Sequence, residues 1–404
     1  MSYLSERFKF VKFRDILSIF GLLLMFIPAM IAKIFIRDFW LICEDRNEAR
    51  DNGYWLFKYI RENHKEQKVA YAINKKSVDY QKVKNLGKVI QFGSLSHWFW
   101  YLVADKNISS QKNGKPNAAV CYVFEVVLGF RKKNRYFLQH GIVMNNLEFL
   151  HYKNSKIYRF FTTTKDEYNY VVEKFGYKQN QVVLAGLSRF DSLTNENMNP
   201  KQILIMPSWR NWIAREIECE KYEGTKVFEE TEYYKTWNSF LNNERFAKFL
   251  KKNNLIAVFY PHRNMQKYID LFKAGSKNIV IANTKLYDVQ TLINNSACMI
   301  TDYSSVLFDF AYLGKPVIFY QFDEEKFRRA QYEKGYFDYK STVLGTWTDS
   351  ADGVLDILEK EKKNFDKPNQ EKMKQCFMFV DKNNNKRIYE EIKNANKKQN
   401  QIFG

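Results

Sequence analysis

The amino-acid sequence predicts an α/β protein with two doubly wound domains of parallel sheet. Short apolar segments of strand length alternate with segments of helical spacing, which is the pattern typical of parallel sheets. This series occurs once in each half of the chain, and 404 residues suffice for two domains, since a domain typically takes about 100–200 residues. We therefore expect two Rossmann-like domains that face one cleft.

The first element is an apolar segment, 16–32, that carries no charged side chain and has basic residues on both sides. A spanning helix needs about 20 apolar residues, so this length is borderline, and Pro28 is expected to interrupt the helix. A monotopic or re-entrant anchor, a single span and a buried core helix all remain open. The first two predict a membrane-associated segment at 1–38 and place the rest of the chain at the cytoplasmic face of a membrane.

The first series of strands follows this segment. Apolar spacing over 46–62 predicts a helix, and a second helix is expected over 165–175. The stretch 96–104 is rich in aromatic residues. Strands are expected at 69–73, 88–92, 106–110, 135–139, 159–163 and 181–185.

The second series begins after the polar run 195–200, which has no periodicity. Strands are expected at 202–206, 255–260, 278–282, 297–301 and 315–320, with helices at 229–252 and 289–295. We therefore expect one domain at 39–199 and the second at 200–358. The remaining segment, 359–404, is rich in Lys, Asn and Glu and is expected to be a helical tail.

The composition narrows the class of partner. Lys and Arg number 64 and Asp and Glu 45, which gives a net charge of +19. Such a surface favours phosphate-bearing partners: nucleic acid, anionic lipid or a nucleotide-linked substrate. The five cysteines are widely spaced and form no CxxC or Cys/His cluster. This argues for a reducing compartment without disulfides or structural zinc.

Unusual polar residues follow several of the predicted strands, where open parallel sheets bind ligands. His140 and Gly141 follow one strand of the first series. A histidine at such a place has an approachable ring and can act as a general base, although a hydrogen-bonded turn histidine is the plainer interpretation. Arg210 follows a strand of the second series, and its planar guanidinium group can bind a phosphate or form an ion pair. His262 and Arg263 follow another.

A further strand runs into Thr301 and Asp302, and Ser304 and Ser305 precede the next helix. Ser304 can cap that helix. The free backbone N–H groups of the first turn, two hydroxyls and the helix dipole favour a phosphate, whereas an ordinary cap would bind no ligand. A Walker glycine loop and a GxGxxG motif are both missing from the sequence, which argues against ATP hydrolysis and NAD chemistry.

These motifs, in this order, resemble the CDP-glycerol glycerophosphotransferase family, the teichoic acid primases and polymerases. The resemblance covers about 40–340. It rests on Leu138-Gln-His-Gly141, Gly186-Leu-Ser-Arg-Phe-Asp191, Pro207-Ser-Trp-Arg210, Tyr260-Pro-His262, Thr301-Asp-Tyr-Ser-Ser305 with Phe308-Asp309, and Lys315-Pro-Val-Ile-Phe-Tyr320. The family has a two-domain GT-B-like fold and moves an alditol phosphate from a CDP-alditol to a polyprenyl-diphosphate-linked acceptor at the inner membrane face.

The resemblance implies roles position by position. His140 matches the candidate general base, and His262 matches a histidine that contacts the donor pyrophosphate. Thr301, Ser304 and Ser305 match a phosphate-binding turn, and Arg210 matches the arginine of its motif. Two departures stand out: Ser188 replaces a proline, and Lys334 with Gly335 stands where the family often has Arg-Gly. Lysine keeps the charge but loses the bidentate geometry.

The motifs and the resemblance together predict a CDP-alditol-dependent transferase. His140 would take the proton of an acceptor hydroxyl as its oxygen attacks the β-phosphorus and CMP leaves, while Arg210, His262, Lys334 and the turn at Ser304 stabilise the developing charge. We expect no cofactor and no obligatory metal, although Asp302 beside phosphates can hold Mg²⁺. The expected partners are a CDP-alditol donor, a polyprenyl-diphosphate-linked glycan acceptor and an anionic membrane surface.

Other interpretations stay open. The donor alditol can be glycerol or ribitol. A GT-B glycosyltransferase that uses a nucleotide sugar would have the same fold. A basic membrane- or nucleic-acid-binding protein without catalysis is a third possibility, but the sequence has no helix-turn-helix, RNP-type motif or zinc finger, so we expect no nucleic-acid partner.

Overall fold

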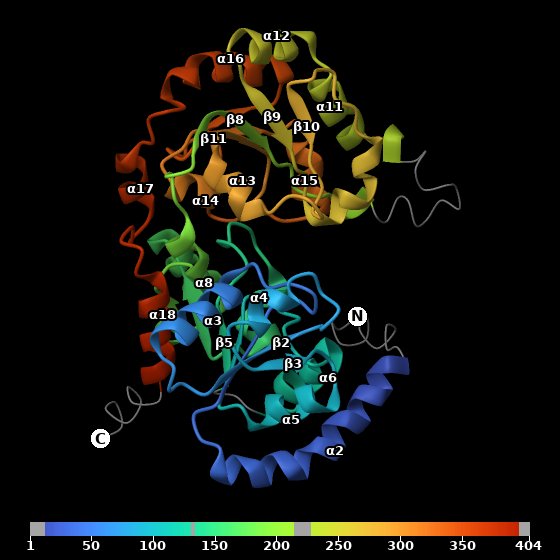
Figure 1. The fold of residues 1–404 in the computed structure, drawn as a ribbon, viewed down its shortest axis with the longest axis vertical. Helices are drawn as coiled ribbons and strands as arrows, with labels where there is room; N and C mark the ends of the chain where they lie inside the picture. The colour runs from blue at the N-terminus through green and yellow to red at the C-terminus, as the bar shows by residue number, and fades with distance from the viewer. Residues whose placement is uncertain (1–12, 131–133, 214–227, 396–404) are drawn as a thin grey trace. The chain divides into compact units, whose positions relative to one another are not determined.

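The computed structural model describes residues 13–130, 134–213 and 228–395. The chain forms two compact units (Figure 1). Unit 1 comprises the described chain up to residue 142, then 147–191 and the chain from Asp381 on; unit 2 comprises 143–146 and 192–380. The segment expected as a carboxy-terminal tail therefore contributes to both units.

Unit 1 is built on a seven-stranded sheet in the order β3-β2-β1-β4-β5-β6-β7. All neighbouring strands are parallel, as predicted. The strands are β1 (Trp40–Cys43), β2 (Val69–Ile73), β3 (Val89–Gln91), β4 (Lys106–Ser109), β5 (Arg135–Phe137), β6 (Arg159–Thr162) and β7 (Val182–Leu184). The order reverses between β1 and β4, so their carboxyl ends flank the switch point where such sheets bind ligands.

Helices cover both faces of this sheet. Alternate residues of β1 point to opposite faces, and each set is buried. Trp40 and Ile42 pack into one buried cluster, and Leu41 and Cys43 into another. The helices of unit 1 after the first are α3 (Asn52–Asn63), α4 (Tyr80–Lys84), α5 (Leu95–Val103), α6 (Ala118–Tyr122), α7 (Tyr152–Ser155), α8 (Lys165–Phe175) and α18 (Asn384–Asn394), with the π-helix η1 (Val123–Val127) and the 3₁₀ helices η2 (Glu148–Leu150), η3 (Gln179–Gln181) and η4 (Ser188–Ser192).

Two local features of unit 1 differ from the prediction. Strand β1 was not predicted; it is central in the sheet but only four residues long. The helix expected over 46–62 begins only at Asn52. Asp51 has an extended backbone and its side chain accepts a hydrogen bond from the N–H of Asn52, so it acts as the cap that starts the helix.

Unit 2 has a six-stranded parallel sheet in the order β10-β9-β8-β11-β12-β13. Its strands are β8 (Asn199–Ile205), β9 (Ile256–Phe259), β10 (Ile279–Ile281), β11 (Ser296–Thr301), β12 (Val317–Tyr320) and β13 (Thr346–Thr348). Its helices are α11 (Glu232–Leu241), α12 (Glu244–Lys252), α13 (Val289–Asn295), α14 (Leu307–Tyr312), α15 (Glu324–Ala330), α16 (Ala351–Glu361) and α17 (Gln370–Cys376), with the 3₁₀ helices η5 (Arg263–Leu271) and η6 (Lys362–Asn364).

The single helix expected over 229–252 is two helices. Asn242 ends α11, and the side chain of Asn243 accepts a hydrogen bond from the N–H of Phe246 to begin α12. Asparagine favours such a break because its side chain bonds the backbone locally. Strand β13, at the edge of the sheet, was not predicted.

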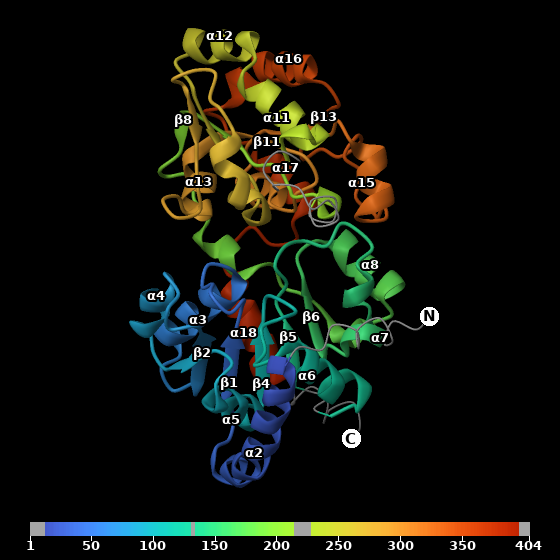
Figure 2. The ribbon, with the colours of Figure 1, turned by 90° about the vertical axis from the view of Figure 1, so that its right-hand side faces the viewer.

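The amino-terminal apolar segment is one continuous helix, α2 (Phe13–Phe35), that belongs to unit 1. The predicted interruption at Pro28 is wrong, since the helix continues past it. By length and composition α2 is the one described helix that could cross a membrane. In the two views of the ribbon it lies along the outside of unit 1, beside α5 (Figures 1 and 2).

Candidate active site

His140 lies just past the carboxyl end of β5, and its side chain is 62% exposed. The preceding residue, Gln139, has a positive φ of 65°, which is uncommon for a residue with a side chain. Its amide is held in the core, where Nε2 donates to the carbonyl of Phe161 at 2.5 Å and to a carboxylate oxygen of Glu167 at 2.9 Å. The buried Gln139 thus fixes the turn that presents the His140 ring at the sheet edge.

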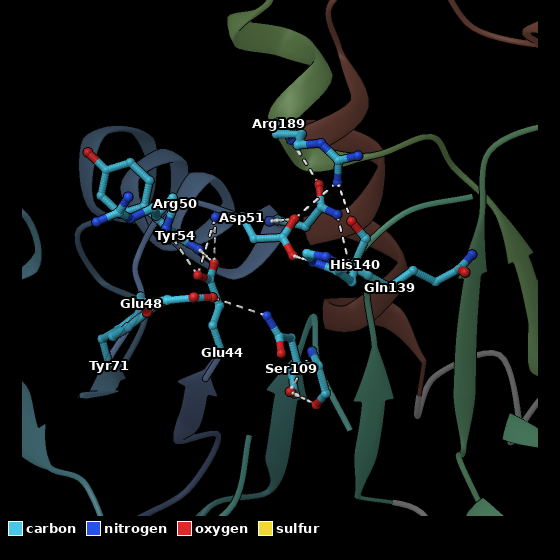
Figure 3. A network of polar contacts seen from close by, with 12 residues as sticks. Glu44, Glu48, Arg50, Asp51, Tyr54, Tyr71, Ser109, Gln139, His140 and Arg189 are labelled. Atoms are coloured by element: carbon cyan, nitrogen blue, oxygen red, sulfur yellow. Dashed lines mark hydrogen bonds and ion pairs between the residues drawn. The ribbon is translucent and has the colours of Figure 1, made fainter. Parts of the chain in front are cut away.

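Asp51 orients this ring. Its Oδ2 lies 2.6 Å from Nδ1 of His140, and its Oδ1 accepts from Nη1 of Arg189 at 3.0 Å (Figure 3). Arg189 Nη1 also donates to the carbonyl oxygen of His140 at 2.8 Å. Burial opposes ionisation of Asp51, but the attraction of His140 and Arg189 and the hydrogen bonds outweigh it and lower the pKa of Asp51.

An ionised Asp51 can only accept a hydrogen bond. The proton of a neutral His140 ring is therefore assigned to Nδ1, and Nε2 is left as the acceptor. A carboxylate on one ring nitrogen and an accessible second nitrogen are what a general base requires, since the carboxylate stabilises the imidazolium that forms. Arg189 holds both partners in place.

A second carboxyl group, Glu44, lies at the end of β1 beneath this pair (Figure 3). It is fully buried and accepts the backbone N–H groups of Arg50, Asp51 and Tyr54 at 2.6–3.2 Å. Burial and the charge of Asp51 raise the pKa of Glu44 to about 8. Glu44 therefore holds the segment that carries Asp51, and its pKa lies well above the usual range of a glutamic acid.

In unit 2, Arg210 does not have the accessible position expected of a phosphate ligand. Its side chain is fully buried, and it forms ion pairs with Asp323 at 2.7 Å and with Asp302 at 2.9 Å. Its Nη1 donates to the hydroxyl and the carbonyl of Ser208. The physical reason is the pair of buried carboxylates, which require a buried cation; Arg210 holds the strand ends together.

Asp302 and Thr301 are likewise used inside unit 2. Asp302 Oδ1 accepts from the N–H of Ser208 at 2.8 Å, and the Thr301 hydroxyl donates to the carbonyl of Met206 at 2.7 Å. Both side chains are buried. They tie the end of β11 to the end of β8 and face neighbouring protein groups.

Ser304 and Ser305 are partly exposed. The expectation that Ser304 caps the following helix needs correction, because α14 begins only at Leu307 and Val306 stands at its cap position. The Ser304 hydroxyl accepts from the N–H of Val306 at 3.4 Å. The two serines therefore lie in the turn that leads from β11 into α14.

His262 follows β9, and its Nδ1 accepts from the N–H of Asn264 at 3.2 Å. Its ring stacks near Trp209, with 6.2 Å between centroids. Trp209 comes from the end of β8, so the ends of β8, β9 and β11 meet. Arg263 is exposed beside His262, and Lys334 is exposed in the loop after α15.

The predicted site residues thus fall into two groups. His140 and Gly141 lie in unit 1, and the other eight lie in unit 2. Sequence reasoning missed Asp51, Glu44, Arg189 and Asp323. Arg189 lies in a motif that carried the resemblance, and Asp51 precedes a helical pattern as a capping residue does, but neither signal indicated a contact with His140.

Among the residues that the structure describes, no group of three or more His, Cys, Asp or Glu side chains could hold a metal ion. Asp302, which the sequence suggested as a residue that can hold Mg²⁺, forms an ion pair with Arg210 at 2.9 Å.

A family model described as CDP-Glycerol:Poly(glycerophosphate) glycerophosphotransferase matches residues 36–394. The minor teichoic acid biosynthesis protein GgaB of Bacillus subtilis is 34% identical over 366 residues, which are 87% of this chain and 39% of GgaB. The teichoic acid ribitol-phosphate polymerase TarL of Staphylococcus aureus is 25% identical over 213 residues, 50% of this chain and 35% of TarL. The chain therefore spans well under half the length of these two relatives.

Solved structures show the same fold at low sequence identity. The wall teichoic acid polymerase TagF gives a TM-score of 0.66 at 16% identity, over 96% of this chain and 98% of that chain. The S. aureus MnaA–UDP structure gives 0.54 at 12% identity, over 89% of this chain and 97% of that chain. These likenesses confirm the predicted two-domain GT-B-like class.

Proposed function

Because the chain belongs to the CDP-glycerol:poly(glycerophosphate) glycerophosphotransferase family, we propose that it transfers glycerol phosphate from CDP-glycerol to a hydroxyl of a polyprenyl-diphosphate-linked acceptor. CMP is the second product, and the reaction serves the synthesis of teichoic acid or a related cell-surface polymer. The observation that carries the proposal is the pair of Asp51 and an exposed His140 at the ligand-binding edge of unit 1.

His140 Nε2 accepts the proton of the acceptor hydroxyl while the hydroxyl oxygen forms a bond to the β-phosphorus of the donor. The bond between that phosphorus and the bridging oxygen breaks, and CMP leaves with the bond's electron pair. The ionised Asp51 stabilises the imidazolium of His140, and Arg189 keeps Asp51 in place.

Donor binding is assigned to unit 2. Ser304 and Ser305 supply hydroxyl groups, and His262, Arg263 and Lys334 supply hydrogen-bond donors and positive charge for a diphosphate. Their exposure supports this assignment. Arg210 is assigned a positioning role instead of a contact with the donor. Its guanidinium is bound by Asp302 and Asp323, and it thereby holds the end of β11 that leads into the turn.

CDP-ribitol is the second candidate donor. It is favoured by the relative TarL, which is named a ribitol-phosphate polymerase, while a variant of TagF has been soaked with CDPG. We place the reaction at the cytoplasmic face of the bacterial membrane, where a lipid-linked acceptor is presented beside anionic lipid. The net charge of +19 supports this location.

The proposal is tested by measuring the nucleotide that the purified chain releases with a lipid-linked disaccharide acceptor, which is CMP from a CDP donor and UDP from a UDP-sugar. CDP-glycerol, CDP-ribitol and a set of UDP-sugars are compared at equal concentration. Release of CMP from CDP-glycerol supports the proposal, and release from CDP-ribitol alone reassigns the alditol. Turnover of a UDP-sugar with neither CDP donor would overturn it in favour of a glycosyltransferase.

A further inference from the structure

The segment that carries Arg189 has little regular structure of its own. Arg189 lies on η4, a 3₁₀ helix of five residues, yet its guanidinium reaches both Asp51 and the carbonyl of His140 (Figure 3). Short 3₁₀ helices have poorer hydrogen-bond geometry than α-helices. Contacts from other elements must therefore hold Arg189 at the edge of the sheet.

Asn52, the first residue of α3, makes one of these contacts and is completely buried. Its Oδ1 accepts from the backbone N–H of Arg189 at 3.0 Å, and its Nδ2 donates to the carbonyl of Gln139 at 2.8 Å. These two bonds assign the orientation of the amide, because only its oxygen accepts and only its nitrogen donates. Asn52 thus joins the backbone of Arg189 to the turn that presents His140.

A second set of contacts comes from the start of α18 and binds the carboxylate of Asp191. Its Oδ1 accepts from the N–H and Nδ2 of Asn384 at 2.9 and 2.7 Å, and its Oδ2 accepts from the N–H and Nδ2 of Asn385, both at 2.8 Å. A carboxylate can accept about four hydrogen bonds, so these donors use its capacity. The two backbone N–H groups belong to the first turn of α18, where the helix dipole also favours a negative charge.

The same helix end holds the chain on the other side of Arg189. Asn385 Nδ2 also donates to the carbonyl of Ser188 at 2.9 Å, so Asn385 binds residues both before and after Arg189. Gly186 has a positive φ of 87°, and a Cβ at this position would overlap Oδ1 of Asn384. Only glycine allows so close an approach in this conformation. The segment 186–191 is therefore fitted to the start of α18.

Helix α18 is itself fixed to the body of unit 1. It lies beside α3 (Figure 1). Ile388 and Ile392 are completely buried in the cluster that also contains residues of β1. Tyr389 stacks on His64 with 3.8 Å between the ring centroids. The helix is thus a firm support for the segment that carries Arg189.

We propose that the start of α18 is a positioning element of the active site, in which Asn384 and Asn385 hold Asp191 and thereby keep Arg189 on Asp51 and His140. The proposal rests on the proposed function only for the role of His140 as the base. Asp191 is a positioning residue, because it acts on the base through Arg189. The alternative is that Asp191 only caps α18, which would stabilise the helix without any dependence on Arg189.

The first measurement follows the tautomer of the His140 ring by ¹⁵N NMR, without substrate, at a pH where the ring is neutral. In the parent chain the contact with Asp51 selects the Nδ1–H tautomer. Asp191→Asn keeps the volume but offers one acceptor oxygen instead of two, so Arg189 should loosen and a mixture of both tautomers should appear. Glu390→Gln, at an exposed carboxylate on the same helix, is the matched control and should leave the signal unchanged. An unchanged signal in the Asp191 variant would overturn the proposal.

Turnover gives a second readout. Asp191→Asn should lower kcat for CMP release about 10- to 100-fold, because the catalytic group is misplaced, and the KM for the donor should stay within a few-fold of the parent chain. Asp191→Asn is then combined with Arg189→Ala. If Asp191 acts through Arg189, the double variant is no slower than Arg189→Ala alone. Losses that multiply would show that the two residues act independently and would overturn the proposal.

The two readouts separate this inference from the proposed function. A parent chain that releases no CMP with any CDP donor, while Asp191→Asn still changes the His140 tautomer, would count against the proposed function and leave the role of α18 supported. Normal turnover of the parent chain with the same His140 signal in both chains would count against α18 alone. Asn385→Ala removes only the side-chain donors of one residue, and it repeats both measurements with smaller expected changes should Asp191→Asn fail to fold.

Discussion

Nδ1 of His140 lies 2.6 Å from Oδ2 of Asp51, although the two residues are 89 positions apart in the sequence. Asp51 comes from the start of α3 and His140 from the end of β5. The two segments meet because β1 and β5 both flank β4 in the sheet of unit 1. The contact turns an exposed histidine into one whose ring orientation and tautomer are set by the fold.

Asp51→Asn should lower kcat for CMP release by about 10²–10⁴-fold, since the amide no longer stabilises the imidazolium and allows the wrong tautomer. KM for the donor should change little, because Asp51 acts through His140. The measurement is steady-state CMP release. Asp166→Asn, an exposed carboxylate in the first turn of α8, is the matched control and should retain full activity. A normal kcat in the Asp51 variant would contradict the role assigned to Asp51.

Glu44→Gln should change the pH dependence of stability. Burial and the charge of Asp51 raise the pKa of Glu44 from 4.5 to about 8 in the folded chain. Between these values the unfolded chain has lost the proton that the folded chain retains, so the free energy of unfolding falls as pH rises. Urea unfolding at pH 5 and pH 8 should show a smaller decrease in the variant than in the parent chain. An equal decrease in both would show that Glu44 does not cause it.

Arg210→Ala should destabilise unit 2 by about 3–5 kcal/mol, because it leaves Asp302 and Asp323 buried without their cation. Arg245→Ala is the matched control: Arg245 pairs with Asp356 at 2.6 Å on the surface, where water screens the pair, and its loss should leave stability nearly unchanged. Chemical unfolding measures both. Unchanged stability of the Arg210 variant with a raised donor KM would restore Arg210 to the phosphate site.

Ser304→Ala with Ser305→Ala should raise the KM for the CDP donor about tenfold or more, since two hydrogen bonds to a charged diphosphate are lost. Stability should be nearly unaffected, because both side chains are partly exposed. Titration calorimetry measures the dissociation constant of the donor directly, without turnover, and this constant should rise as well. Ser239→Ala, on the exposed side of α11, should bind the donor as the parent chain does. Equal donor affinity in the double variant would remove the turn from the proposed donor site.

The sequence allowed the fold class to be predicted because most strands of the two sheets are short apolar runs, as in β2 and β12. Strand β2 coincides with the predicted 69–73. Strand β1 was missed because it is only four residues long and follows closely on a longer apolar segment. The gap between α11 and α12 depends on two asparagine caps, which local apolar spacing does not reveal.

Local sequence predicted the positions of site residues at strand ends, but it did not predict their long-range contacts. The position of His140 at a strand end follows from an apolar run and a glycine. Its contact with Asp51, and the burial of Arg210 against Asp323, 113 residues away, depend on long-range packing. For that reason, the residues that orient the base were missed, and a buried arginine was expected to face a phosphate.

The most direct test of the account is the rate of CMP release by His140→Ala, measured together with its affinity for the CDP donor. We predict that turnover falls by at least about 10²-fold while donor binding stays within a few-fold of the parent chain, since His140 lies in unit 1 and the donor residues are assigned to unit 2. A near-normal rate of CMP release in this variant would contradict the central claim that His140 is the general base.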